Sequence, residues 1–164
     1  MKIISIVGAY SVLIAGSLFA SSLQEQNKEI ARRAFEELLS KGHYELAEQL
    51  YAKDFINHGV QRNIDLEEDQ AWLKGWHQAF PDGVIIAEKL IAEDDLVAVY
   101  WTAHGTNTGT GNGLPATGRK VKLAGVTIWR IVDGKIKEEW GAFDQLSLMK
   151  QLGLFPENKQ QSGS

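Results

Sequence analysis

The first half of the chain repeats apolar residues at the spacing of an α-helix. This pattern covers 27–42, 44–52 and 65–80; a glycine closes the first segment and a proline follows the third. The apolar positions of the three stripes are Ile30, Ala31, Ala34, Phe35, Leu38, Leu39, Leu46, Ala47, Leu50, Tyr51, Trp72, Leu73, Trp76 and Phe80. We therefore expect three amphipathic helices, with a loop or a short extended piece at 54–60 between the second and the third.

From Val84 onward the pattern changes to that of β-strands. Four runs rich in β-branched and aromatic residues occupy 84–93, 96–106, 119–132 and 135–143. The first two runs are separated by a pair of aspartates, and the last two by Asp133-Gly134, which suits a type I′ turn. The Gly/Thr-rich segment 107–118 between the two pairs lacks a phosphate-binding glycine pattern and is expected to be a long hairpin connection.

A last short helix is expected after the fourth strand. Leu146, Met149 and Leu152 can share one helical face, and Gly153 can end it. The chain thus has helices first, then a meander of about four strands, and one helix at the end. This order predicts an α+β domain with a curved antiparallel sheet wrapped over the N-terminal helices. The concave side of such a sheet is only partly filled by helices, so we expect a pocket there.

Composition narrows the function classes. The chain has 164 residues, a formal net charge of −4 and no cysteine. No block of lysine and arginine stands out, so nucleic acid is not an expected partner. The lack of cysteine rules out disulfides, thiolate metal sites and cysteine nucleophiles, and the spacing of the four histidines matches no zinc pattern.

The N-terminal residues have the features of a secretory signal peptide. A lysine precedes a largely apolar run, and small residues allow cleavage after Ser22 or, alternatively, after Ala20. A weak membrane anchor and a buried first helix are the alternative interpretations. We expect a signal peptide at 1–22, one domain at 23–156 and a disordered tail at 157–164. The mature protein would be periplasmic or secreted, without membrane contact after cleavage.

Several motifs resemble one known family. They are "FINH", "FPD", "GLPATGRKV" and "IVDGKIKEEW…D…QLG", and the similarity extends over about 27–154. The chain resembles the SnoaL-like polyketide cyclase (ester cyclase) family, within the nuclear transport factor 2-like superfamily. The resemblance implies a cone-shaped sheet, a homodimer, no metal and no cofactor. It also implies an aldol-type ring closure in which an aspartate acts as acid and base, although the positions of the cyclases' aspartate and histidine fall on Gly141 and Thr127 here.

Three residues are candidates for acid–base chemistry. Asp144 could be a general base if apolar walls raise its pKa, but it also stands where a helix N-cap is expected, and the cap is the stronger interpretation. His58 or Glu139 could assist it. Glu138 and Glu139 alternate across a strand, so one is expected to point inward and the other outward.

The expected ligand is a small apolar or aromatic molecule. The residues expected to contact it are Asn57, Trp76, Phe80, His104, Thr127, Trp129 and Trp140. Core packing is the alternative role of most of these aromatic rings, and His104 could equally belong to a dimer surface. Counting from the predicted turn without a bulge, Trp140 would oppose Thr127 and share a face with Trp129. Two functions remain open: acid–base chemistry on a carbonyl compound, of aldol, cyclisation or isomerisation type, or an exported binding module without chemistry.

Overall fold

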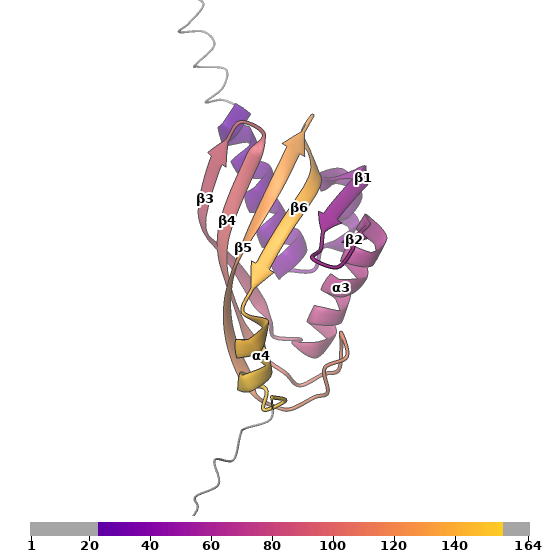
Figure 1. The fold of residues 1–164 in the computed structure, drawn as a ribbon, viewed down its shortest axis with the longest axis vertical. Coiled ribbons are helices and arrows are strands. Elements are labelled where there is room, and N and C mark those ends of the chain that lie inside the picture. Colours follow the sequence, from indigo (N-terminus) through magenta and orange to yellow (C-terminus); the bar gives the residue numbers. More distant parts are fainter. Residues whose placement is uncertain (1–22, 156–164) are drawn as a thin grey trace, which may run out of the picture.

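One curved, unclosed sheet of six strands organises the computed structural model, which describes residues 23–155 (Figure 1). The strand order is β2-β1-β6-β5-β4-β3. The strands are β1 (Tyr51–His58), β2 (Asn63–Ile64), β3 (Val84–Glu93), β4 (Leu96–Thr106), β5 (Lys120–Val132) and β6 (Lys135–Phe143). The predicted signal peptide at 1–22 and the predicted tail at 157–164 lie outside the described residues.

The helices occupy the predicted places. The first is α-helical over 23–33 and continues as the wider helix η1 (Ala34–Ser40). A single turn, η2 (Tyr44–Leu46), leads into α2 (Ala47–Leu50), and α3 (Leu66–Ala79) and α4 (Gln145–Gln151) follow later in the chain. Asp65 caps α3 by accepting a hydrogen bond from the backbone N–H of Glu68 at 3.0 Å. None of the helices within the described range combines the length and apolar character that crossing a membrane requires.

The largest difference from the sequence prediction concerns β1. The second helix ends at Leu50. Residues predicted as the end of this helix, and as a loop or a short extended piece after it, form a strand that pairs with β6 in parallel. The sheet is therefore mixed, with two more strands than predicted. Tyr51 and Phe55 explain the strand, because both are buried and their rings meet edge to face at 4.9 Å. The polar residues between them hid this strand from a search for apolar alternation.

The β5–β6 hairpin has the predicted turn but a different register. Asp133 and Gly134 both have positive φ, 50° and 74°, as a type I′ turn requires. An irregularity next to Ile131 then shifts the pairing by one residue. As a result, Trp129 opposes Glu139, whereas Trp140 opposes Ile128 and not Thr127. The prediction that Trp140 shares a face with Trp129 is wrong for this reason.

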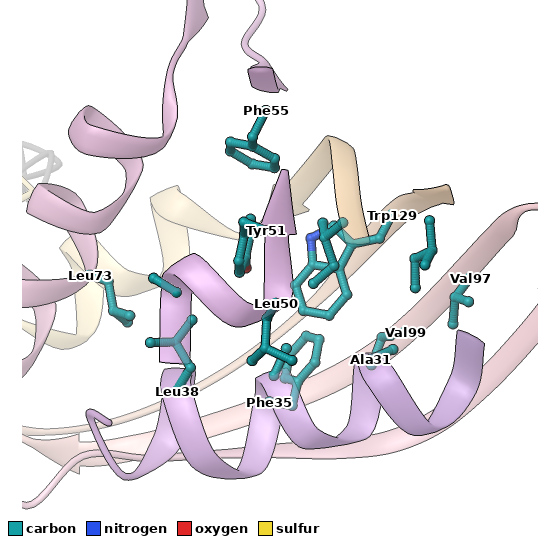
Figure 2. Close-up of a cluster of buried hydrophobic side chains, with 14 residues drawn as sticks. Ala31, Phe35, Leu38, Leu50, Tyr51, Phe55, Leu73, Val97, Val99 and Trp129 are labelled. Carbon is teal, nitrogen blue, oxygen red and sulfur yellow. The ribbon is translucent and has the colours of Figure 1, made fainter. Parts of the chain in front are cut away.

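The core lies between the helices and the inner face of the sheet, which we define as the face toward the helices (Figure 2). Trp129 is fully buried there, with its ring 5.0 Å from that of Phe35 on η1. A second buried cluster joins the end of α3 to β4, β5 and α4. In α4 the buried residue is Leu148, and Leu152, directly after the helix, is buried as predicted. The predicted apolar face with Leu146 and Met149 is therefore displaced by part of a turn.

The connection 107–118 closes this second cluster and is tightly organised. Asn107 is fully buried and donates from its side chain to the carbonyl of Ala79 at the end of α3, at 3.1 Å. A Cβ atom on Gly111 would lie 1.9 Å from the carbonyl oxygen of Gly75 on α3. The glycines of this segment therefore allow it to lie directly against α3.

Candidate functional site

A cavity of about 300 Å³ lies between the inner face of the sheet and the helices η1 and α3. Its walls are mostly apolar and aromatic, and four polar side chains reach it. The aromatic lining residues are Phe35, Trp72, Trp76, Trp101, Trp129 and Phe143. The polar ones are Asn57, Asp69, Thr127 and Glu139. An apolar cavity with a few convergent polar groups is the usual form of a small-molecule site.

Glu139, on β6, is the first of two carboxyl groups in the cavity. The indole N–H of Trp129 donates to its Oε2 at 2.7 Å. The surrounding protein desolvates this carboxyl and the charge of Asp69 opposes its ionisation, so its pKa rises to about 8 against the weaker, opposite effect of the Trp129 hydrogen bond. Glu139 is therefore predominantly a neutral acid at pH 7.

The second carboxyl group in the cavity belongs to Asp69 on α3. The side-chain amide of Asn57 donates to its Oδ1 at 2.9 Å. Asn57 is also the neighbour of Glu139 across the β1–β6 pair, so both acids lie next to the same residue. Desolvation raises the pKa of Asp69, whereas the Asn57 hydrogen bond lowers it. The charge of Asp69 adds to the larger effect of desolvation in opposing ionisation of Glu139, so Asp69 is the acid that ionises first and Glu139 the second.

Open space lies beside Glu139. A Cβ atom on Gly141 would be 3.5 Å from Oε1 of Glu139 and 3.9 Å from the hydroxyl oxygen of Thr127. Thr127 is buried and accepts a hydrogen bond from the indole N–H of Trp101 at 3.1 Å. The oxygen of Glu139 that Trp129 does not hold is thus the one next to this space, where a ligand atom can approach it.

The structure brings five of the ten predicted site residues to the cavity: Asn57, Trp76, Thr127, Trp129 and Glu139. It places Asp144 elsewhere. The carboxylate of Asp144 is exposed and accepts a hydrogen bond from the backbone N–H of Ser147 at 2.8 Å, which makes it the N-cap of α4. The cap interpretation is confirmed, and Asp144 is not among the residues that line the cavity.

Two other predicted residues lie together on the outer face of the sheet, opposite to the helices. The imidazole of His58 stacks on the indole of Trp140, with centroids 4.6 Å apart and planes 9° from parallel. His58 also contacts Glu138 at 2.7 Å, and Glu138 pairs with Arg130 at 2.9 Å. His104 is exposed on β4, at a position that alternation assigns to the same outer face.

Phe80 is also outside the cavity lining. It is fully buried in the second core cluster, where its ring lies 4.2 Å from that of Trp76. Its role is therefore the core packing that was the alternative interpretation of its position in the sequence.

Asp69 is the site residue that the sequence prediction missed. A signal for it was present, because Asp69, Leu73 and Trp76 follow the spacing of one helical face. A carboxylate on the apolar stripe of an amphipathic helix either is neutralised or faces a polar site. Trp101 and Phe143 also line the cavity, and only the register of the sheet places them there.

The family follows from a comparison with known proteins. The sequence profile of the SnoaL-like polyketide cyclase family matches residues 29–152, so the chain belongs to this family. Its mixed fold, with a curved sheet and N-terminal helices, is that of the nuclear transport factor 2-like superfamily. No curated protein sequence is similar enough to count as a relative.

Solved structures share the fold. AclR from Streptomyces galilaeus, a proposed hydroxylase, is 23% identical, with 84% of this chain and 87% of that one covered and a TM-score of 0.73. A proposed SnoaL-like polyketide cyclase from Jannaschia sp. CCS1 is 23% identical, with coverages of 82% and 96% and a TM-score of 0.74. IdmH from Streptomyces antibioticus, a proposed polyketide cyclase, is 25% identical, with coverages of 78% and 99% and a TM-score of 0.69.

Proposed function

We propose that this protein is an enzyme that carries out acid–base chemistry on a small apolar carbonyl compound, of the aldol, cyclisation or isomerisation type. The observation that carries the proposal is the pair of desolvated carboxyls in one apolar cavity, Glu139 and Asp69. Their environments differ, and pairs of acids whose pKa values are pushed apart commonly divide the roles of acid and base between them.

The roles follow from the order of ionisation. Glu139, neutral and held at Oε2 by Trp129, can donate its proton in a hydrogen bond from Oε1 to the carbonyl oxygen of a substrate. Asp69, ionised and held at Oδ1 by Asn57, can accept the proton from the carbon next to that carbonyl. The resulting enolate is stabilised by Glu139. It then either attacks a second carbonyl, whose oxygen takes the proton from Asp69, or takes that proton back at another carbon.

This assignment replaces the base expected from the sequence. Asp144 is committed to the cap of α4, and His58 lies on the other face of the sheet. Glu139 keeps a role in the site, as the acid that supports Asp69. The aromatic walls limit the water around both groups, which strengthens their interaction with a developing negative charge.

A proton-exchange experiment tests the proposal without knowledge of the natural substrate. The probe is 2-tetralone, a bicyclic ketone, and deuterium uptake next to its carbonyl is followed by NMR in D₂O. The wild-type protein should accelerate uptake, and Glu139→Gln and Asp69→Asn should each lower the rate by roughly 10²–10⁴-fold or down to the uncatalysed rate, the range typical of lost general acid or base catalysis.

Two matched variants control for the change of charge. Glu138→Gln makes the same substitution one residue earlier on β6, and Glu67→Gln makes it on the exposed side of α3. Both should exchange at the wild-type rate. Uptake that is equally fast with the wild type, Glu139→Gln and Asp69→Asn would refute the assignment of the two acids.

The alternative is a binding module without chemistry. Gly141 and Thr127 favour it, since they stand at the positions that match the aspartate and histidine of the cyclases. It predicts that 2-tetralone binds, as detected by quenching of tryptophan fluorescence, while deuterium uptake stays at the rate in buffer.

Export and dimerisation belong to the proposal as well. Mass spectrometry of protein recovered from outside the cytoplasm should find a mature N-terminus directly after Ser22 or Ala20. Native mass spectrometry of the same sample should find two subunits. A full-length N-terminus would contradict export, and a monomer at micromolar concentration would contradict dimerisation.

A further inference from the structure

The ionisable side chains that line the cavity are all acidic. Eighteen residues line it, and they include four tryptophans, two phenylalanines and two carboxylic acids. Lysine, arginine and histidine do not occur among these lining residues. Other carboxylates in the described part of the chain form ion pairs, most of them at the surface. Glu138, for example, pairs with Arg130. The two acids of the cavity differ from them.

Asp69 in particular has no cationic partner among the described residues. Its hydrogen-bond donor is the neutral amide of Asn57, and none of the ion pairs formed between 23 and 155 includes Asp69 or Glu139. A desolvated carboxylate without a counter-charge is costly, so a cation that enters the cavity relieves this cost.

The aromatic walls offer a second attraction for the same kind of ligand. The face of an aromatic ring attracts a cation, most strongly in the case of tryptophan, and cages of such rings recognise organic ammonium groups. Trp72, Trp76 and Trp101 line the cavity together with Asp69. An anionic ligand would instead meet the charge of Asp69 with no basic side chain to compensate it.

We infer that the substrate of this cavity carries a positive charge, and that its class is the hydrophobic amino ketones, carbonyl compounds with a protonated or quaternary ammonium group. The inference rests on the proposed function for the carbonyl part of the molecule and on the lining residues for the ammonium part. The carbonyl oxygen faces Glu139, and the ammonium group lies against the tryptophans near Asp69. Carboxylates and phosphates are excluded as ligands.

A cation in the cavity also favours the ionised form of Glu139. The titratable groups that face Glu139 are Asp69 on α3, whose charge raises the pKa of Glu139, and the buried hydroxyl of Tyr51 on β1, whose own pKa is raised by burial and by the charge of Glu139. Binding of a permanent cation should therefore release a proton near neutral pH and become tighter as the pH rises from 6 to 8. A neutral ligand should show neither effect.

The test compares three probes of similar size by isothermal titration calorimetry at pH 8: benzylammonium, benzyl alcohol and benzoate. The wild-type protein should bind benzylammonium roughly tenfold or more tightly than benzyl alcohol, as expected for a cation–π contact combined with a desolvated carboxylate. Benzoate should not bind measurably. Asp69→Asn combined with Glu139→Gln should lose the preference for benzylammonium while the affinity for benzyl alcohol stays the same, because no carboxylate then remains in the cavity. Glu67→Gln should behave like the wild type.

Equal affinity for benzylammonium and benzyl alcohol in the wild type, or binding of benzoate, would overturn the inference even if the double variant failed to fold. The outcome is separable from that of the proposed function. Fast deuterium uptake from 2-tetralone without a cation preference would remove this inference alone, whereas a cation preference without deuterium uptake would keep the charge selectivity and remove the chemistry.

Discussion

Glu138 and Glu139 are neighbours in the chain and identical in chemistry, yet the fold gives them opposite roles. Glu138 points to the outer face, where its carboxylate contacts His58 at 2.7 Å and Arg130 at 2.9 Å and keeps 27% of its side-chain surface exposed. Glu139 points to the inner face, where its pKa rises to about 8. The first belongs to a network of surface ion pairs, and the second is a neutral acid inside a cavity.

This difference shows that a shift of one residue along a strand is enough to separate a carboxylate at the surface from a carboxyl group in the cavity. Successive side chains of a strand point to opposite faces, so one residue of register decides which glutamate enters the cavity. The same alternation separates the two indoles of this hairpin: Trp129 lies inside against Phe35, and Trp140 lies outside against His58.

The largest expected effect distinguishes these two indoles. Trp129→Ala should lower the free energy of unfolding by roughly 3–5 kcal/mol, because it empties a fully buried position and removes the donor to Glu139. Trp140→Ala should cost only about 1 kcal/mol, the value of one ring stack at a partly exposed site. Urea denaturation of both variants measures the difference, and equal losses would contradict the assignment of the two faces.

The next effect is on the pH dependence of stability. The pKa of Glu139 rises from its ordinary 4.5 to about 8 on folding, so between these values the folded protein retains a proton that the unfolded chain has lost. Stability should therefore fall as the pH rises from 5 to 8, by up to about 1.4 kcal/mol per pH unit, and be highest at the acid end. Asp69, whose pKa is also raised, adds a slope of the same sign.

Glu139→Gln isolates the contribution of this glutamate. The amide oxygen of glutamine can still accept the Trp129 hydrogen bond, but it does not ionise. The variant should have a smaller pH slope than the wild type and should be the more stable of the two at pH 8. Thermal unfolding at several pH values measures this, and parallel curves for the two proteins would contradict a raised pKa.

A smaller effect concerns two glycines of the inner face. Gly141→Ala places its Cβ at 3.5 Å from Glu139, an ordinary contact, and should stabilise the protein by roughly 0.5–1 kcal/mol because alanine restricts the unfolded chain. Gly125→Ala places its Cβ at 2.3 Å from the ring of Trp101 and should destabilise it. Chemical denaturation measures the change in the free energy of unfolding for both variants. A destabilised Gly141→Ala variant would mean that the space beside Glu139 is filled.

The smallest effect is expected on the outer face. Glu138→Gln should change stability by less than about 1 kcal/mol, since partly exposed ion pairs contribute little and are screened by salt. The loss should shrink further in 1 M NaCl. A loss of several kcal/mol that does not respond to salt would mean that the outer network is as shielded as the cavity.

The sequence predicted much of this framework. Helical spacing located the first helix and α3, the Asp133-Gly134 pair located the hairpin, and alternation placed one of the two adjacent glutamates inward. These features depend on residues close together in the chain. The cap role of Asp144 was also readable, because a helix start is a local signal.

The site was less predictable because it depends on contacts between distant segments. The register irregularity beside Ile131 has no marker in the sequence, yet it moves Trp140 away from the cavity. The parallel pairing of β1 with β6 brings Asn57 next to Glu139, and nothing in the local pattern of β1 indicates its partner. Asp69 was readable from its helical stripe, but its relation to Glu139 needed the fold.

The proposed chemistry depends above all on Glu139 being the weaker of the two acids in the cavity, so that it is still neutral when Asp69 has lost its proton. The measurement that tests it most directly is a ¹³C NMR titration of the side-chain carboxyls, with the Glu139 signal assigned through Glu139→Gln and that of Glu138 as an internal reference. The account predicts a midpoint of about 8 for Glu139, with Asp69 titrating at lower pH. A midpoint for Glu139 near its ordinary 4.5 would contradict it.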